Sequence, residues 1–318
     1  MLSRVADSLY WMSRYLERAE HTARLIDVTL NLMLDQSPLM AERRWQLVMS
    51  GLGLPPTDTR DAYKLTESLA FDAENPGSIV SSIIAARENA RQVREQISSE
   101  MWEELNRLYL QVKSARIEQI WNFGSHAYFR NVKEGAHLFQ GITDSTMSHG
   151  QGWRFIQVGR FIERAGATAA LLDAHFKYLS DPNIESDGKS DYLEWVGLLK
   201  CCTAFEACCK VYSADLQPDR IAEFLLLNAD FPHSVRFSAD MLQAGLNAIA
   251  EATQTHKSSR ANRLAGKLRA ALSFVQIEEI MESDLHSYLK DIERQCLQIH
   301  DAIYQAYITY QIESAPVS

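Results

Sequence analysis

The residues best suited to chemistry are two Glu-Arg pairs, which belong to a motif that occurs twice in the chain. Residues 14–27 read RYLERAEHTARLID and residues 160–173 read RFIERAGATAALLD, with eight of the fourteen positions identical. On a helix, three charged residues of each copy share one face: Arg14, Glu17 and Arg18 in the first, and Arg160, Glu163 and Arg164 in the second. Each copy therefore places a carboxylate between two guanidinium groups.

These charges fit three roles. We favour a buried reciprocal network, in which Glu17 meets Arg164 and Glu163 meets Arg18, because buried charges must be paired. The second role is a site in which the arginines and glutamates hold a carboxylate or phosphate ligand, and the third is a solvated face. If the protein is an enzyme, Glu17 and Glu163 are the candidate general bases.

A second candidate site is a basic stripe in the segment AARENARQVRE. Arg87, Arg91 and Arg94 fall within about 60° of one another around a helix. The simplest interpretation is a solvated or ion-paired face. The alternative is an anion site or a docking face for an acidic partner.

Composition and charge restrict the class of protein. The 318 residues carry a net charge of −9 and the pI is about 5.5, which argues against general nucleic-acid binding. No secretory signal or long uncharged apolar stretch is found, so we expect a cytoplasmic protein without a membrane span. The odd cysteine count disfavours disulfides. Cys201 and Cys208 would lie roughly 10 Å apart along a helix, so we expect buried core cysteines, no metal site and no cofactor.

The predicted fold class is all-α, a bundle of long antiparallel helices. Prolines fall where helices would begin or end, and the proline-free stretches are rich in strong helix formers. No alternating strand pattern or hairpin turn is found. The expected long helices span 2–35, 77–120, 150–180, 190–212, 233–254 and 277–312, with shorter helices between them and loops near 53–60, 181–190 and 255–258.

Weaker echoes of the repeat follow the motif in the same order along the chain. Trp45 pairs with Trp195, and Pro76 and Ser78 pair with Pro232 and Ser234. We therefore expect a single domain of two related halves, about 1–148 and 149–318, packed around a pseudo-two-fold axis.

Several stretches carry a resemblance to a known family. The opening MLSRVADSLYWMSRYLERAEHTARL, the segment ENPGSIVSSIIAARENARQVREQIS, and the stretches GITDSTM and GWRFIQVGRFIERA resemble the bacterial alpha-E domain family. They cover the chain from its first residue to about 250. The resemblance implies an all-helical fold in which the Glu-Arg motif is the family's hallmark.

The resemblance also implies partners. Similar proteins are encoded beside, or fused to, an ATP-grasp ligase of permuted topology and a transglutaminase-like protein, which suggests a role in making or modifying a peptide or amide bond. We expect a non-catalytic accessory or binding protein of such a system, with an enzyme or a purely architectural protein as alternatives. The second motif copy has Gly166 and Ala170 where the first has Glu20 and Arg24, so a charged site that uses both halves is asymmetric, or the site is confined to the first half.

Overall fold

A computed structural model describes residues 1–34, 38–56, 59, 61–180, 188–213, 216–253 and 259–308. This part of the chain contains helices and no strands, which confirms the all-α prediction. Parts of the expected loops lie outside the described residues, namely 57, 58 and 60 of the first, 181–187 of the second and all of 255–258. Residues 309–318, at the end of the expected helix 277–312 and beyond, also lie outside them. The helices are α1 (Ser3–Leu32), α2 (Pro38–Gly51), α3 (Ala62–Ala70), α4 (Ile79–Gln92), α5 (Ser99–Ser114), α6 (Ile117–Phe123), α7 (Ser125–Thr146), α8 (Gln151–Leu179), α9 (Gly188–Cys201), α10 (Phe205–Tyr212), α11 (Pro218–Leu227), α12 (Val235–Ala252), α13 (Arg260–Phe274), α14 (Ile277–Glu282) and α15 (Leu285–Ile303), followed by a π-helical turn at Tyr304–Ile308.

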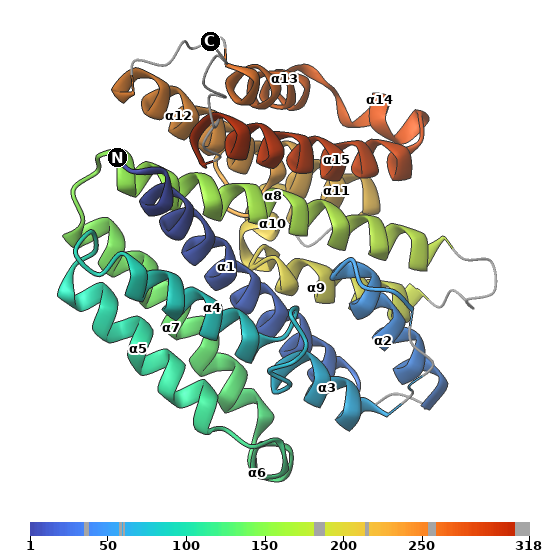
Figure 1. Ribbon diagram of the computed structural model, residues 1–318. Coiled ribbons are helices and arrows are strands. Elements are labelled where there is room, and N and C mark those ends of the chain that lie inside the picture. Colours follow the sequence, from blue (N-terminus) through green and yellow to red (C-terminus); the bar gives the residue numbers. More distant parts are fainter. Residues whose placement is uncertain are drawn as a thin grey trace, which may run out of the picture.

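The two longest helices, α1 and α8, pack against each other in the middle of the molecule; they begin close together and diverge toward their C-terminal ends (Figure 1). Their line of close contact is called the crossing. Helices α4, α5 and α7 lie on one side of the crossing, and α12, α13 and α15 lie on the other (Figure 1). Both central helices carry buried residues around most of their circumference, because they pack against neighbours on several sides. The motif copies therefore lie in the core of the molecule.

Small residues allow the central helices to approach closely. Ala19 and Ala165 are fully buried, and Gly159 of α8 lies against the backbone of α1. A Cβ atom at Gly159 would lie 2.3 Å from the carbonyl oxygen of Tyr10, closer than real contacts allow. The glycine is therefore required by the crossing itself.

The order of helices follows the predicted repeat. Helices α1 and α8 have 30 and 29 residues, and α2 and α9 have 14 each. Ser78 caps α4 and Ser234 caps α12, each accepting from a backbone N–H three residues later. The division at 148/149 and the pseudo-two-fold axis stay predictions.

Three helices expected to be continuous are divided, because local side-chain and backbone geometry ends them. The expected helix 77–120 divides into α4 and α5, since the Ser98 side chain caps α5. The helix 190–212 breaks at Thr203, whose φ of 54° lies in the left-handed region. The helix 277–312 divides where Asp284 accepts from the His286 N–H. No described helix has the length and apolarity to cross a membrane.

Candidate functional site

Three charged residues from each motif copy meet where α1 crosses α8: Arg14, Glu17 and Arg18 from the first copy, and Arg160, Glu163 and Arg164 from the second. Nη2 of Arg164 lies 2.9 Å from Oε2 of Glu17, and Nε of the same arginine bonds the other oxygen. In return, Oε1 and Oε2 of Glu163 accept from Nε of Arg18 at 2.8 Å and Nε of Arg14 at 2.7 Å. Both predicted pairs are therefore present, one in each direction across the crossing.

The two halves of this network differ in exposure. The Glu17 and Arg164 side chains are 3% and 4% exposed, and Arg160 lies 3.9 Å from Glu17. Burial and the neighbouring Arg164 charge lower the pKa of Arg160 to about 10. Glu163 is more accessible, with 12% of its side chain exposed. Burial acts to raise the pKa of Glu163, but the charges of Arg14 and Arg18 outweigh it and hold this pKa below the usual value. The network thus has a sealed side at Glu17 and a more open side at Glu163.

Aromatic side chains surround Arg14, on the open side of the network. Nη1 of Arg14 donates to the Tyr10 hydroxyl at 3.2 Å and lies 3.0 Å from Nδ1 of His300. Its guanidinium carbon lies 4.5 Å from the centre of the Trp11 ring. Arg14 is therefore held by partners in several directions, and its place in the site is fixed before any ligand arrives.

A cavity of about 350 Å³ opens beside Glu163. Its walls come from α1, α8 and α15, and residues 51–54 with Gly77 complete it. Arg14, Arg18 and Glu163 form its charged wall. The open side of the Glu-Arg network is thus the wall of a pocket, at the small end of the range typical of small-molecule sites.

The sequence profile of Alpha-E, described as a predicted alpha-helical domain with a conserved ER motif, matches residues 1–308. The chain belongs to the Alpha-E family. In this member, Glu-Arg pairs occur at 17–18 and at 163–164, the residues that form the network.

Curated relatives of this Alpha-E protein occur in Mycobacterium. A protein of Mycobacterium bovis and one from each of two Mycobacterium tuberculosis strains, all described as uncharacterized, are 24% identical over 322 residues. The match covers 94% of this chain and 35% of each relative, so the chain spans about a third of their length. No solved structure matches the chain.

The predicted basic stripe of this Alpha-E protein, on α4 and the turn after it, does not line the cavity. Arg87 donates to Asn106 of α5, and Arg91 pairs with Glu88 within α4. The expectation that Arg94 continues the helix is wrong, because α4 ends at Gln92. Arg87 and Arg94 nevertheless contact the same aromatic ring, because their guanidinium carbons lie 5.2 and 5.7 Å from the Trp102 ring centre.

All five cysteines are free thiols. Cys201, Cys202, Cys208 and Cys296 are buried as expected, while Cys209 is only partly buried. Burial raises the pKa of Cys202 and of Cys296 to about 12, so neither thiol ionises near neutral pH. Among the described residues no three His, Cys, Asp or Glu side chains group together as metal ligands.

Sequence reasoning missed a second set of paired charges. Asp27 bonds Lys133 at 2.6 Å and His126 at 2.8 Å, both on α7. The repeat counterpart Asp173 is bonded by His286 and lies 3.4 Å from Lys290, both on α15. The repeat itself contained this signal, because Asp27 and Asp173 are among the identical motif positions.

Arg44 of α2 and Glu194 of α9 form a further buried ion pair that the sequence reasoning missed. Each residue directly precedes one of the paired tryptophans, Trp45 and Trp195. The repeat therefore places opposite charges at equivalent positions, and these charges pair with each other across the molecule.

Proposed function

We propose that this chain is a cytoplasmic, non-catalytic helical protein that binds an ATP-grasp-type peptide or amide ligase or the peptide substrate of that ligase. The observation that carries the proposal is the cavity beside Glu163, whose charged wall of Arg14 and Arg18 suits an anionic ligand. The family resemblance supplies the ligase system and a possible second partner, a transglutaminase-like protein. The greater length of the curated relatives is compatible with such associations.

The state of the two candidate bases supports a binding role over a catalytic one. A general base works best with a pKa near the operating pH. The pKa of Glu163 lies below its usual value, and its two oxygens already accept from Arg14 and Arg18. Glu17 is sealed against Arg164 and has little access to a substrate. Both glutamates are therefore better suited to holding arginines in place than to removing protons.

A docking face for the ligase is proposed on α4 and α5. Arg87 and Arg94 flank Trp102, and the side chain of Arg91 is 61% exposed. Arginine and aromatic side chains are both enriched at protein interfaces. We expect an acidic surface of the partner to contact this face, although the chain as a whole carries a net charge of −9.

The test is affinity capture of the tagged protein from its native lysate, with mass spectrometry of the partners and light scattering of the complex. We expect a stoichiometric ATP-grasp ligase, and its loss with Arg91→Glu. Arg294→Glu is a matched control, because both arginines are highly exposed and pair with an acid three residues earlier. Failure of the purified ligase to associate in any nucleotide state would contradict the proposal.

A further inference from the structure

The cavity beside Glu163 exists because one motif copy lacks the side chains that occupy the equivalent position in the other. In the first copy, Glu20 is buried and bonded to Arg24, and His137 of α7 lies 3.4 Å from it. In the second copy the counterparts of Glu20 and Arg24 are Gly166 and Ala170, which line the cavity. A Cβ atom at Gly166 would meet nothing within 4 Å.

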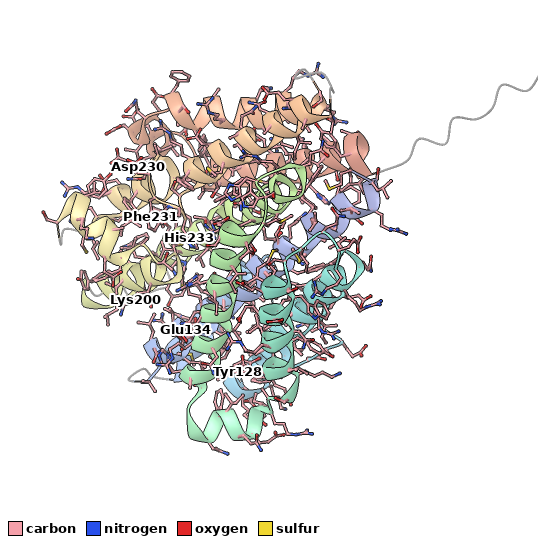
Figure 2. All side chains as sticks on the ribbon, turned by 90° about the vertical axis from the view of Figure 1, so that its left-hand side faces the viewer. Tyr128, Glu134, Lys200, Asp230, Phe231 and His233 are labelled. Carbon is pink, nitrogen blue, oxygen red and sulfur yellow. The ribbon has the colours of Figure 1, made fainter. Side chains whose placement is uncertain are left out.

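Two more positions follow the same exchange. His233 lies beside α8 (Figure 2), where its carbonyl accepts from Thr168, and its counterpart one residue after the repeated proline is Gly77. His137 follows His126 by eleven residues, and Leu297 follows His286 by the same interval. Both Gly77 and Leu297 line the cavity. Small or apolar residues at the cavity therefore stand where the equivalent region beside Glu17 has four polar side chains: Glu20, Arg24, His137 and His233.

Polar groups without partners remain on the α1 wall of the cavity. Thr22 is 1% exposed, yet its hydroxyl has no hydrogen-bond partner, and Nε2 of His21 is likewise buried and unpaired. Arg18 bonds Glu163 only through Nε, so its two terminal amino groups are available. These three residues are spaced i, i+3 and i+4, and share one face of α1. Buried polar groups of this kind are expected to have partners, so the wall is suited to a bound molecule.

The charges and the apolar residues define the ligand. Arg14 and Arg18 carry two positive charges and Glu163 one negative charge, which leaves one positive charge for a single anion. Glu293 also lines the cavity and is paired with Lys290. The remaining wall is apolar and includes Leu52, Leu54, Ile162 and Leu297. A monoanion with an apolar body fits this wall better than a doubly charged phosphate.

We propose that the cavity binds the carboxyl-terminal end of a short peptide or an N-acylated apolar amino acid. The carboxylate pairs with Arg18, the amide meets Thr22 and His21, and the apolar side chain packs against the leucine-rich wall. Burial lowers the pKa of His21, so its imidazole is neutral near pH 7 and exchanges hydrogen bonds without adding charge. This inference rests on the proposed function for its binding role, and names the class of ligand.

The probe is N-acetyl-L-leucine, titrated into the full chain by calorimetry. We expect saturable binding at one site, and binding at least tenfold weaker for the uncharged N-acetyl-L-leucinamide. The double variant Gly166→Glu/Ala170→Arg restores the residues of the first copy and is expected to abolish binding. Its control is Gly141→Glu/Ala270→Arg, because both of those positions are exposed on other helices. If the filled variant does not fold, Arg18→Ala tests the same wall, with melting temperatures recorded for each protein.

The outcomes separate this inference from the proposed function. Equal binding of acid and amide, preference for inorganic phosphate, or unchanged binding by the filled variant or Arg18→Ala would overturn the inference. Absence of any binding would also overturn it, while capture of the ligase would leave the accessory role standing. Conversely, binding of N-acetyl-L-leucine without ligase association would retain the ligand site and contradict the partner.

Discussion

The sealed ion pair between Glu17 and Arg164 gives the sharpest prediction about stability. Glu17→Gln keeps the shape of the side chain but removes its charge, and leaves Arg164 buried without a carboxylate. Breaking a buried pair in this way typically costs about 3–5 kcal/mol. An unfolding entropy of about 2.1 cal/mol/K per residue gives roughly 0.7 kcal/mol/K for this chain, so we expect the melting temperature to fall by about 4–7 °C.

The assay is thermal and urea unfolding of wild type, Glu17→Gln and two comparison variants. Glu163→Gln should cost less, because its partner Arg18 is 31% exposed and water can replace the lost contact. Glu88→Gln breaks an exposed pair and should change the stability by less than about 1 kcal/mol. A midpoint shift at constant m-value is required for the comparison to report stability.

Two results would refute the reasoning about Glu17. If Glu17→Gln and Glu88→Gln lower the free energy of unfolding by the same amount, burial does not strengthen the Glu17–Arg164 ion pair. If Glu17→Gln leaves stability unchanged but abolishes an activity found in the ligase system, the carboxylate acts in a site and the enzyme alternative gains support.

Three further predictions concern other parts of the fold. Arg44→Glu and Glu194→Arg should each cost about 3–5 kcal/mol, and the double swap should recover most of that loss in a denaturant double-mutant cycle. Gly159→Ala should cost about 1–3 kcal/mol or more, measured by urea unfolding, because its methyl group would collide with the Tyr10 carbonyl. Burial lowers the pKa of His175 to about 4, so the unfolded state binds more protons between pH 6.5 and 4, and stability falls as the pH drops through that window. His175→Gln should remove up to about 3 kcal/mol of this change in stability with pH. If the slope of the profile is unchanged in the variant, the pH dependence comes from other groups.

The sequence predicted the contacts of the motif better than it predicted where helices end. The pairs Glu17–Arg164 and Glu163–Arg18 follow from the repeat, because equivalent faces of α1 and α8 meet where small residues allow close approach. Helix ends depend on single residues. The Asp284 cap lies within a run of apolar residues that step by three or four, Met281, Leu285 and Tyr288, so periodicity alone could not locate the break.

The cavity could not be predicted from the motif residues alone. The exchange of Glu20 for Gly166 indicates asymmetry, but an absent side chain opens a pocket only if no neighbour fills the space. That outcome depends on Leu297 and Gly77, which come from segments far away in the sequence. The match of Leu297 to His137 becomes visible only through the equivalent contacts of His126 with Asp27 and of His286 with Asp173. Asymmetry was therefore readable in the sequence, whereas an empty space was not.

The repeat also explains how one helical scaffold can combine a rigid core with the proposed binding site. On the Glu17 side, polar side chains occupy the equivalent positions: Glu20 bonds Arg24, and Thr168 donates to the His233 carbonyl. On the Glu163 side, equivalent positions have lost those side chains, and Thr22 is left unpaired at the cavity wall. Because the sealed side holds α1 against α8, the open side can lose packing without losing its geometry. Filling the cavity with the residues of the first copy should consequently preserve or raise stability while it removes binding, the trade expected when a functional site is built from a structural one.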